Sequence, residues 1–232
     1  MNWTAYIDNY CERLLPGFWD EPLNAISNGA FWLAAWVVWR GWRDWQRAKV
    51  ANLPIHSKAD GWDIQSLLVM VLLIGLGSFA FHTFATRWAG ALDVLFIAVY
   101  LHFYLAVYLH RALRWRWALA WLGVPLFLLL SQGLSVGWRQ AMPGSSAGYL
   151  SAWTVLLLLC VHSAIKKLES TRALTLAAVG FAVSLSLRQL DMPLCSDWRW
   201  GTHFAWHLLN AATLGLTTWA MVRLHMRSYE RT

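Results

Sequence analysis

Seven apolar stretches constrain the fold of this chain more than any other feature of its sequence. Each stretch is long enough, or nearly so, to cross the hydrocarbon core of a membrane, which takes about 20 helical residues. The predicted spans are residues 22–39, 64–84, 90–109, 117–131, 147–165, 173–188 and 203–222. The sequence therefore predicts an all-α polytopic membrane protein, a seven-helix transmembrane bundle. Residues 1–232 are expected to form a single domain, in which an acidic leader at 1–21 precedes the first span.

The composition argues against a soluble protein and against a nucleic-acid partner. Only 13% of the residues are charged, whereas soluble domains contain about 25%. The 18 tryptophans suit indole rings at two membrane interfaces. The net charge of +7 would suit nucleic acid, but the basic residues are divided among the segments between apolar runs. This distribution is typical of cytoplasmic loops, and no required protein partner is evident.

The distribution of Lys and Arg also predicts the orientation of the bundle. Cytoplasmic segments of membrane proteins carry an excess of these residues. With the N-terminus outside, the inner segments hold 14 of the 19 Lys and Arg residues and the outer segments hold 5. An even number of spans would break this alternation, so the count favours seven spans with a cytoplasmic C-terminus. The expected location is a bacterial inner membrane or an ER or Golgi membrane.

Five polar residues inside or beside the apolar runs form a candidate site. Ionisable groups at membrane depth are costly, so they usually pair, face the protein interior or bind an ion. In the predicted orientation the five residues reach similar depths at the outer ends of three spans. They are Ser78, His82, Asp93, His203 and His207. We therefore expect a site that faces the periplasmic or lumenal side.

The spacing of these residues suits a zinc hydrolase that acts on an amide or an ester. His203 and His207 are four residues apart, which places both imidazoles on one helical face. Together with His82 from another helix, they would hold zinc through three nitrogens and leave a fourth position for water. Zinc lowers the pKa of such a water to about 7. We expect Asp93 to pass a proton to the leaving nitrogen and Ser78 to hydrogen-bond the oxyanion.

Other interpretations stay open at this point. A membrane histidine often bonds only to a neighbouring helix, and a helical serine often bonds to a carbonyl of its own helix. The same residues would also suit a seven-span receptor or transporter, in which they bind a ligand or relay protons. A structural subunit is a third alternative, but it would not need five polar groups at one depth. The convergence of all five favours the hydrolase.

Four short segments and Asp93 resemble the alkaline ceramidase family, which belongs to a wider group of seven-span hydrolases that includes adiponectin-receptor-like proteins. The matching segments are residues 10–12 (YCE), 21–28 (EPLNAISN), 75–82 (GLGSFAFH) and 201–207 (GTHFAWH). The resemblance implies a zinc-dependent amidase that cleaves the N-acyl bond of ceramide, releasing a fatty acid and a sphingoid base. It implies zinc ligands at His82, His203 and His207, with Asp93 as proton carrier and Ser78 as an assisting residue.

The identity of the lipid stays open. Eukaryotic members of the family tend to follow the aspartate with an acidic residue and a proline, whereas residues 94–96 of this chain read VLF. A bacterial-type relative that acts on another N-acyl or ester lipid is therefore an alternative to a ceramidase.

The leader adds a second ion hypothesis. It concentrates carboxylate and amide oxygens, which are the donors that calcium prefers. The resemblance implies a calcium site in this region, best matched here by Asp8, Glu12 and Glu21. The alternative is a solvated acidic leader in which Asp20 caps the first span.

Two of the three cysteines are expected on the outer side of the membrane. Cys11 and Cys195 would lie in an oxidising compartment, which permits a disulfide, and the resemblance implies a bridge between them. Cys160 lies inside the fifth predicted span and is interpreted as an inert packing residue.

Overall fold

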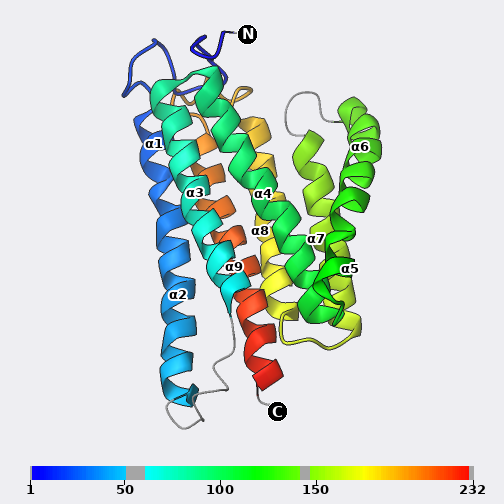
Figure 1. Cartoon of the computed structure of the whole chain (residues 1–232). Coiled ribbons are helices and arrows are strands. Elements are labelled where there is room, and N and C mark those ends of the chain that lie inside the picture. The colour runs from blue at the N-terminus through cyan, green and yellow to red at the C-terminus, as the bar shows by residue number, and fades with distance from the viewer. Residues whose placement is uncertain (1, 51–60, 142–146, 230–232) are drawn as a thin grey trace.

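The computed structural model describes residues 2–50, 61–141 and 147–229 as a bundle of long helices that run side by side (Figure 1). The helices of these described residues are, in chain order, α1 (Pro22–Ser27), α2 (Gly29–Val50), α3 (Trp62–Phe84), α4 (Arg87–Ala112), α5 (Trp117–Trp121), α6 (Gly123–Ala141), α7 (Ala147–Ile165), α8 (Thr171–Leu190) and α9 (His203–Tyr229). The same residues contain one isolated β-bridge and no strand. The all-α prediction is therefore confirmed.

Five helical segments are long and apolar enough to cross a membrane. They are Trp62–Phe84, Arg87–Ala112, Trp117–Leu134, Gly148–Ile165 and Thr171–Leu190. These segments correspond to the second to sixth predicted spans, although their ends differ from the predicted ends by several residues. The chain therefore has the character of an integral membrane protein.

The helices at the first and seventh predicted spans are long but less apolar. α2 carries Arg40, Arg43 and Asp44 in its second half. α9 packs against α2, α3, α4 and α8, and many of its polar side chains are buried. Because these polar groups face other helices, α9 needs less apolar surface than a helix at the edge of a bundle.

Two of the predicted spans are divided. Asn28 separates α1 from α2, and Pro22 occupies the first turn of α1, where its missing N–H costs no hydrogen bond. α2 continues to Val50, well beyond the predicted end at residue 39.

The fourth predicted span comprises α5 and α6, and Pro125 lies in the first turn of α6, where it interrupts no helical hydrogen bond.

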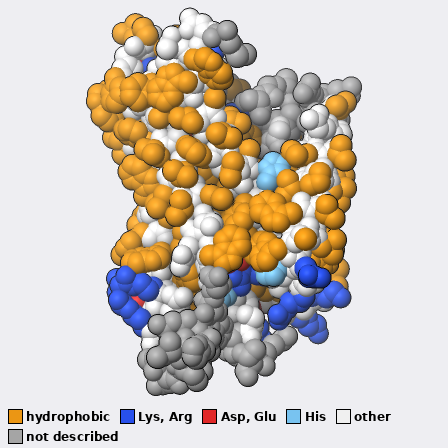
Figure 2. Space-filling view, in the orientation of Figure 1, with side chains coloured by type: hydrophobic (Ala, Val, Ile, Leu, Met, Phe, Trp, Pro, Cys, Tyr) orange, Lys and Arg blue, Asp and Glu red, His pale blue; other side chains and the backbone are white. Residues whose placement is uncertain are grey.

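The outer surface of the bundle is apolar over most of its length. Figure 2 shows hydrophobic side chains over the middle of the visible face, with Lys and Arg side chains toward its lower end. The exposed residues include Val69, Leu72 and Leu76 on α3 and Leu126 and Leu129 on α6. Extended apolar surface of this kind marks contact with lipid or with another protein.

The leader lies across the end of the bundle at which α3 and α4 meet (Figure 1). Its backbone bonds to the α3–α4 turn. The Ile7 N–H donates to the Ala85 carbonyl at 2.8 Å, and the Arg87 N–H donates to the Ala5 carbonyl at 3.1 Å. The leader is therefore an ordered cover over this end of the bundle.

A disulfide joins the leader to the loop between α8 and α9. Cys11 and Cys195 are bonded, with their Cα atoms 5.4 Å apart, so the predicted bridge is confirmed. Cys160 is a free cysteine on α7, half-buried, with its sulfur 3.2 Å from the Thr175 hydroxyl. The bridge connects segments that are 184 residues apart in the chain.

Removal of this bridge should destabilise the protein. A disulfide restrains the unfolded chain, and loss of a native one typically costs about 2–5 kcal/mol. We expect a Cys11→Ser, Cys195→Ser double variant to unfold at a lower temperature than the wild type in a thermal scan in detergent. Cys160→Ser is the matched control and should unfold close to the wild type. An unchanged midpoint in the double variant would contradict a stabilising role for the bridge.

Candidate metal centre

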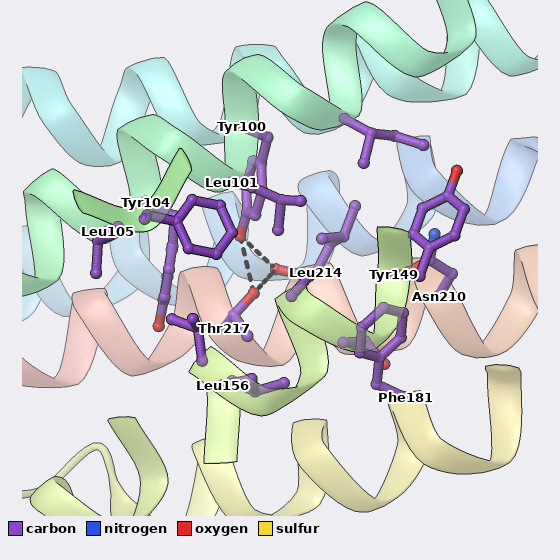
Figure 3. A pocket seen from close by; sticks show the side chains of 15 residues that line it. Tyr100, Leu101, Tyr104, Leu105, Tyr149, Leu156, Phe181, Asn210, Leu214 and Thr217 are labelled. Atoms are coloured by element: carbon purple, nitrogen blue, oxygen red, sulfur yellow. Dashed lines mark hydrogen bonds between the residues drawn. The ribbon is translucent and has the colours of Figure 1, made fainter. Parts of the chain in front are cut away.

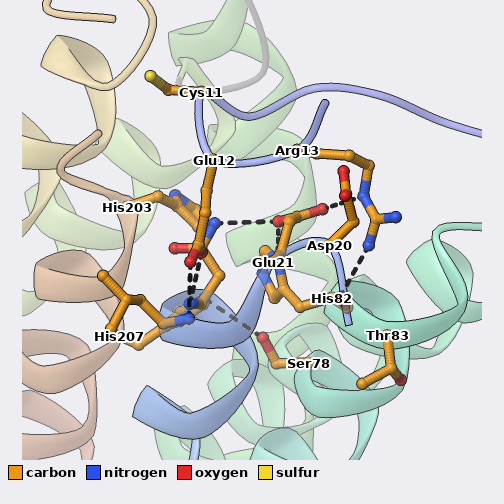
Figure 4. Close-up of polar contacts among 12 residues, drawn as sticks. Cys11, Glu12, Arg13, Asp20, Glu21, Ser78, His82, Thr83, His203 and His207 are labelled. Atoms are coloured by element: carbon orange, nitrogen blue, oxygen red, sulfur yellow. Dashed lines mark hydrogen bonds and ion pairs between the residues drawn. The ribbon is translucent and has the colours of Figure 1, made fainter. Parts of the chain in front are cut away.

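Three histidines from two helices meet at the leader end of the bundle (Figure 4). His82 lies near the C-terminus of α3, and His203 and His207 lie in the first two turns of α9. One ring nitrogen from each lies within 4.8 Å of the other two, and each residue is at most 2% exposed. We call these three residues the histidine triad. The structure thus brings together all three predicted zinc ligands.

The backbone explains why the triad forms. His203 and His207 are one helical turn apart, and their ring centroids are separated by 4.6 Å. α3 ends just beyond His82, where Ala85 adopts a left-handed conformation with φ of 48°. His82 therefore lies level with the start of α9, and its ring centroid is 4.7 Å from that of His207.

Asp191 anchors the start of α9, and the sequence analysis did not single it out. Its Oδ1 accepts the backbone N–H groups of Thr202 and His203 at 2.8 and 2.9 Å, and its Oδ2 accepts that of Cys11 at 3.0 Å. Gly201 has φ of 60°, and a Cβ atom there would lie 2.1 Å from Asp191 Oδ1. One buried carboxylate thus positions both a triad histidine and the leader. The sequence did contain one sign of this role, because Asp191 is an acidic residue that follows directly on an apolar run.

Two of the triad rings are oriented by side chains outside the triad. His82 Nδ1 bonds to Glu21 Oε2 at 2.5 Å, and His207 Nδ1 bonds to the Ser27 hydroxyl at 2.8 Å. Metal-binding histidines usually engage their second nitrogen in this way, which fixes the tautomer and the direction of the ligating nitrogen. The two partners therefore leave the Nε2 atoms of both rings for a ligand.

The triad contains nitrogens without hydrogen-bond partners. Among the described residues, none bonds to His82 Nε2 or His203 Nδ1. His207 Nε2 is 3.5 Å from the Ser78 hydroxyl oxygen, a long contact, and the His203 ring stacks on Tyr10 with centroids 3.8 Å apart. A buried polar atom left unsatisfied costs about 1–3 kcal/mol. Such atoms gathered in one cluster indicate a binding site for a ligand.

The donor set fits zinc. Imidazole nitrogens suit zinc and other late first-row metals, whereas calcium and magnesium prefer oxygen. Three protein ligands are also the number found in catalytic zinc sites, in which a fourth position remains for water or substrate. The described part of the chain places no other group of three His, Cys, Asp or Glu side chains close enough to share a metal ion.

Glu21 is itself held by Arg13, a second residue that the sequence analysis missed (Figure 4). Arg13 Nε donates to Glu21 Oε1, and the other guanidinium nitrogens donate to the carbonyls of Gly17 at 2.9 Å and His82 at 2.8 Å. Burial by itself would raise the pKa of Glu21, but its hydrogen bonds, above all that with His82, outweigh burial and lower the pKa. Glu21 is therefore an ionised partner for His82.

The structure does not bring the three predicted calcium ligands together in the part of the chain that it describes. Asp8 is exposed, and both Glu12 carboxylate oxygens accept backbone N–H groups of α1. Glu21 is bonded to Arg13 and His82. Calcium binding stays a prediction, and the geometry gives it no support.

Glu12, rather than Asp20, caps the first helix. Its two carboxylate oxygens accept the N–H groups of Leu23 at 2.7 Å and Asn24 at 2.8 Å, which are otherwise unsatisfied donors of the first turn. Burial raises the pKa of Glu12. Asp20 instead accepts two backbone N–H groups within the leader.

Ser78 and Asp93 complete the predicted cluster. Ser78 is buried one turn before His82 on α3 and contacts the triad through His207. Asp93 lies in the second turn of α4, is half-buried, and lines a cavity together with Tyr10, whose ring stacks on that of His203. The structure therefore places Ser78 in contact with the triad and Asp93 on the neighbouring helix α4, in a cavity wall that it shares with Tyr10.

A cavity of about 600 Å³ opens beside Asp93, with Asn9, Tyr10 and Arg188 among its polar lining residues. A narrower cavity of about 60 Å³ lies between α4, α7, α8 and α9 (Figure 3). The two cavities share three lining residues, Ile97, Leu101 and Tyr149. The walls of the narrower cavity are mainly apolar. The two cavities are therefore adjacent, and the narrower one is an apolar space inside the bundle.

Comparisons of the chain with protein-family models, with curated proteins and with solved structures found no match. The resemblance seen in the four short segments therefore stays a prediction. The function is inferred below from the residues of the site.

Loss of the buried guanidinium should destabilise the leader and the site. Arg13→Ala would leave the Glu21 carboxylate buried without its cation, and breaking a buried pair in this way typically costs about 3–5 kcal/mol. We expect a clear drop in the unfolding midpoint measured in detergent. Arg199→Ala is the matched control, because Arg199 is exposed in the α8–α9 loop at the same end. Equal midpoints for the two variants would show that the buried pair is not stabilising.

Proposed function

We propose that this protein is a zinc-dependent intramembrane hydrolase that cleaves the N-acyl amide bond of ceramide or of a ceramide-like lipid. The observation that carries this proposal is the histidine triad, in which buried imidazoles from α3 and α9 converge and two of their nitrogens have no hydrogen-bond partner among the residues that the structure describes. Ser78 and Asp93 beside the triad are the groups that amide hydrolysis requires in addition to a metal.

In this proposal each polar residue of the site has one task. His82, His203 and His207 would hold the metal. Zinc bound there would supply Lewis acidity and lower the pKa of water to about 7. Asp93 takes a proton from the attacking water and gives it to the nitrogen of the departing amine. Ser78 donates a hydrogen bond to the carbonyl oxygen as negative charge develops on it. Amide and water are thereby converted into a fatty acid and an amine.

The cavities support a lipid as the substrate. The larger cavity has polar lining beside Asp93, which suits the hydroxyl and amide groups of a lipid headgroup. The same cavity is also lined by the apolar residues Phe81, Val94 and Ile97, which suit the part of an acyl chain next to the amide. A substrate in this position would place its amide beside Asp93.

We infer that α2 and α9 also cross the membrane, which gives seven spans with the N-terminus outside. Both helices lie alongside the five apolar helices in the bundle. The distribution of 14 against 5 Lys and Arg residues supports this orientation. The site then faces the periplasm or an organelle lumen, in agreement with the disulfide in the leader above it.

The metal content of the purified protein tests the proposal directly. We expect about one equivalent of zinc per chain by elemental mass spectrometry, because three nitrogen ligands suffice for a catalytic site. A His203→Ala, His207→Ala double variant should lose this zinc. His102→Ala is the matched control, because His102 bonds only to the Ala98 carbonyl of its own helix in the described structure. A well-folded wild-type protein that takes up no zinc would remove the hydrolase proposal.

Turnover separates the roles of the remaining residues. Purified protein is incubated with a panel of N-acylated lipids, and released fatty acids are measured by mass spectrometry with and without a chelator. We expect His82→Ala to abolish release, and Asp93→Asn to lower kcat by about 10²–10⁴ because proton transfer is lost. Asp44→Asn, an exposed change on α2, should leave turnover unchanged. Full activity in Asp93→Asn would exclude Asp93 as the proton carrier.

A further inference from the structure

A second polar cavity lies at the end of the bundle opposite the histidine triad. It has a volume of about 610 Å³ and is formed by the α4–α5 turn, the α7–α8 turn and the C-terminal part of α9. Its lining includes Arg111, Arg114, Lys166, Lys167 and Arg227. We call it the basic cavity. It takes no part in the proposed hydrolysis.

Within the described residues, the basic cavity has more cationic side chains than acidic partners for them. Arg111 pairs with the Asp63 carboxylate at 2.5 Å, and Arg227 pairs with Glu169 at 3.5 Å. Glu169 is the acidic residue in the lining, and it is shared with a second arginine on α9. Arg114, Lys166 and Lys167 form no ion pair within the described part of the chain, and all three are exposed. The lining therefore presents three cations to a ligand.

Two of these cations occupy unusual backbone positions. Arg114 has φ of 60° and Lys167 has φ of 50°, and each follows the end of a helix. Glycine is the residue that usually takes this left-handed position after a helix, because a Cβ atom makes the conformation costly. Non-glycine residues in this conformation occur as helix caps and also recur at ligand-binding sites. Here the two strained positions display an Arg and a Lys toward the same cavity.

The position of the cavity along the bundle points to a membrane lipid. Trp115 lines it, and tryptophan is enriched where the hydrocarbon core meets the headgroups. Lys and Arg side chains gather at this lower boundary of the apolar surface (Figure 2). On the adjoining helix α7, the apolar residues Leu158, Val161 and Ile165 are 60, 55 and 71% exposed and continue from the cavity along one helical face. A ligand that is anionic at one end and apolar at the other would match both surfaces.

We propose that the basic cavity binds the phosphate of an anionic phospholipid, with Arg114, Lys166 and Lys167 as its cationic contacts. Basic pockets between membrane helices recognise anionic headgroups in this way, because several cations act on one phosphate. The acyl chains of the lipid lie against the exposed face of α7. This site is separate from the hydrolase site and does not depend on the reaction proposed there.

Native mass spectrometry of the full chain in detergent tests the proposal. The delipidated protein is titrated with phosphatidylglycerol, with phosphatidylcholine, and with phosphatidylglycerol in the presence of excess inorganic phosphate. We expect phosphatidylglycerol to bind at least about tenfold more tightly than phosphatidylcholine. An Arg114→Gln, Lys166→Gln, Lys167→Gln variant should lose this preference. The Arg40→Gln, Arg43→Gln, Arg47→Gln variant is the matched control, since it removes the same charge from α2 outside the cavity and should keep the preference.

A glycine variant separates binding from folding. Arg114→Gly with Lys167→Gly removes two cations but relieves the left-handed backbone, so the unfolding midpoint should stay equal or rise while phosphatidylglycerol binding weakens. Unchanged binding in this variant would overturn the proposal, as would an equal loss in the α2 control. Displacement of the lipid by inorganic phosphate at millimolar concentration would also overturn it, because the ligand would then be a free anion.

Discussion

The architecture of the site depends on the need of buried imidazole nitrogens for partners. The triad residues are almost fully excluded from solvent, so water does not satisfy their rings. Glu21 and Ser27 bond to the outer nitrogens of His82 and His207 from a segment that precedes both helices of the triad. Within the described part of the chain, His82 Nε2 and His203 Nδ1 have no hydrogen-bond partner, and a metal ion would satisfy them. The leader and α1 are thus required for the site as much as α3 and α9 are.

The same requirement explains how the leader is built. A carboxylate beside His82 must itself be neutralised in a buried position, and the Arg13 guanidinium does this while bonding to the backbone of the leader and of α3. The leader therefore supplies the cation that pairs with Glu21. The disulfide from Cys11 and the hydrogen bond from the same residue to Asp191 hold this segment against the start of α9.

The bundle has two chemically different ends separated by an apolar surface. At the leader end, polar groups are buried and paired around the triad. At the other end, cations remain exposed around the basic cavity. α9 connects the two, because it begins with triad histidines and ends beside that cavity. Polar side chains on α9 would cost free energy if they faced lipid. They cost little here because neighbouring helices supply hydrogen bonds, as the Tyr100 hydroxyl on α4 does for Thr217 and Thr218.

The sequence by itself determined the helical class, five apolar segments and the identities of the residues that converge. Hydrophobic stretches report burial in lipid directly, and histidines four residues apart share a helical face whatever surrounds them. The sequence did not determine that Asn28 separates α1 from α2, that α2 continues to Val50, or that Arg13 and Asp191 hold the site together. Those depend on contacts between segments far apart in the chain, since Asp191 matters only because Cys11 and His203 lie beside it in space. Only the tertiary structure decided that the Arg13 guanidinium pairs with Glu21 and that the Glu12 carboxylate bonds to the first turn of α1.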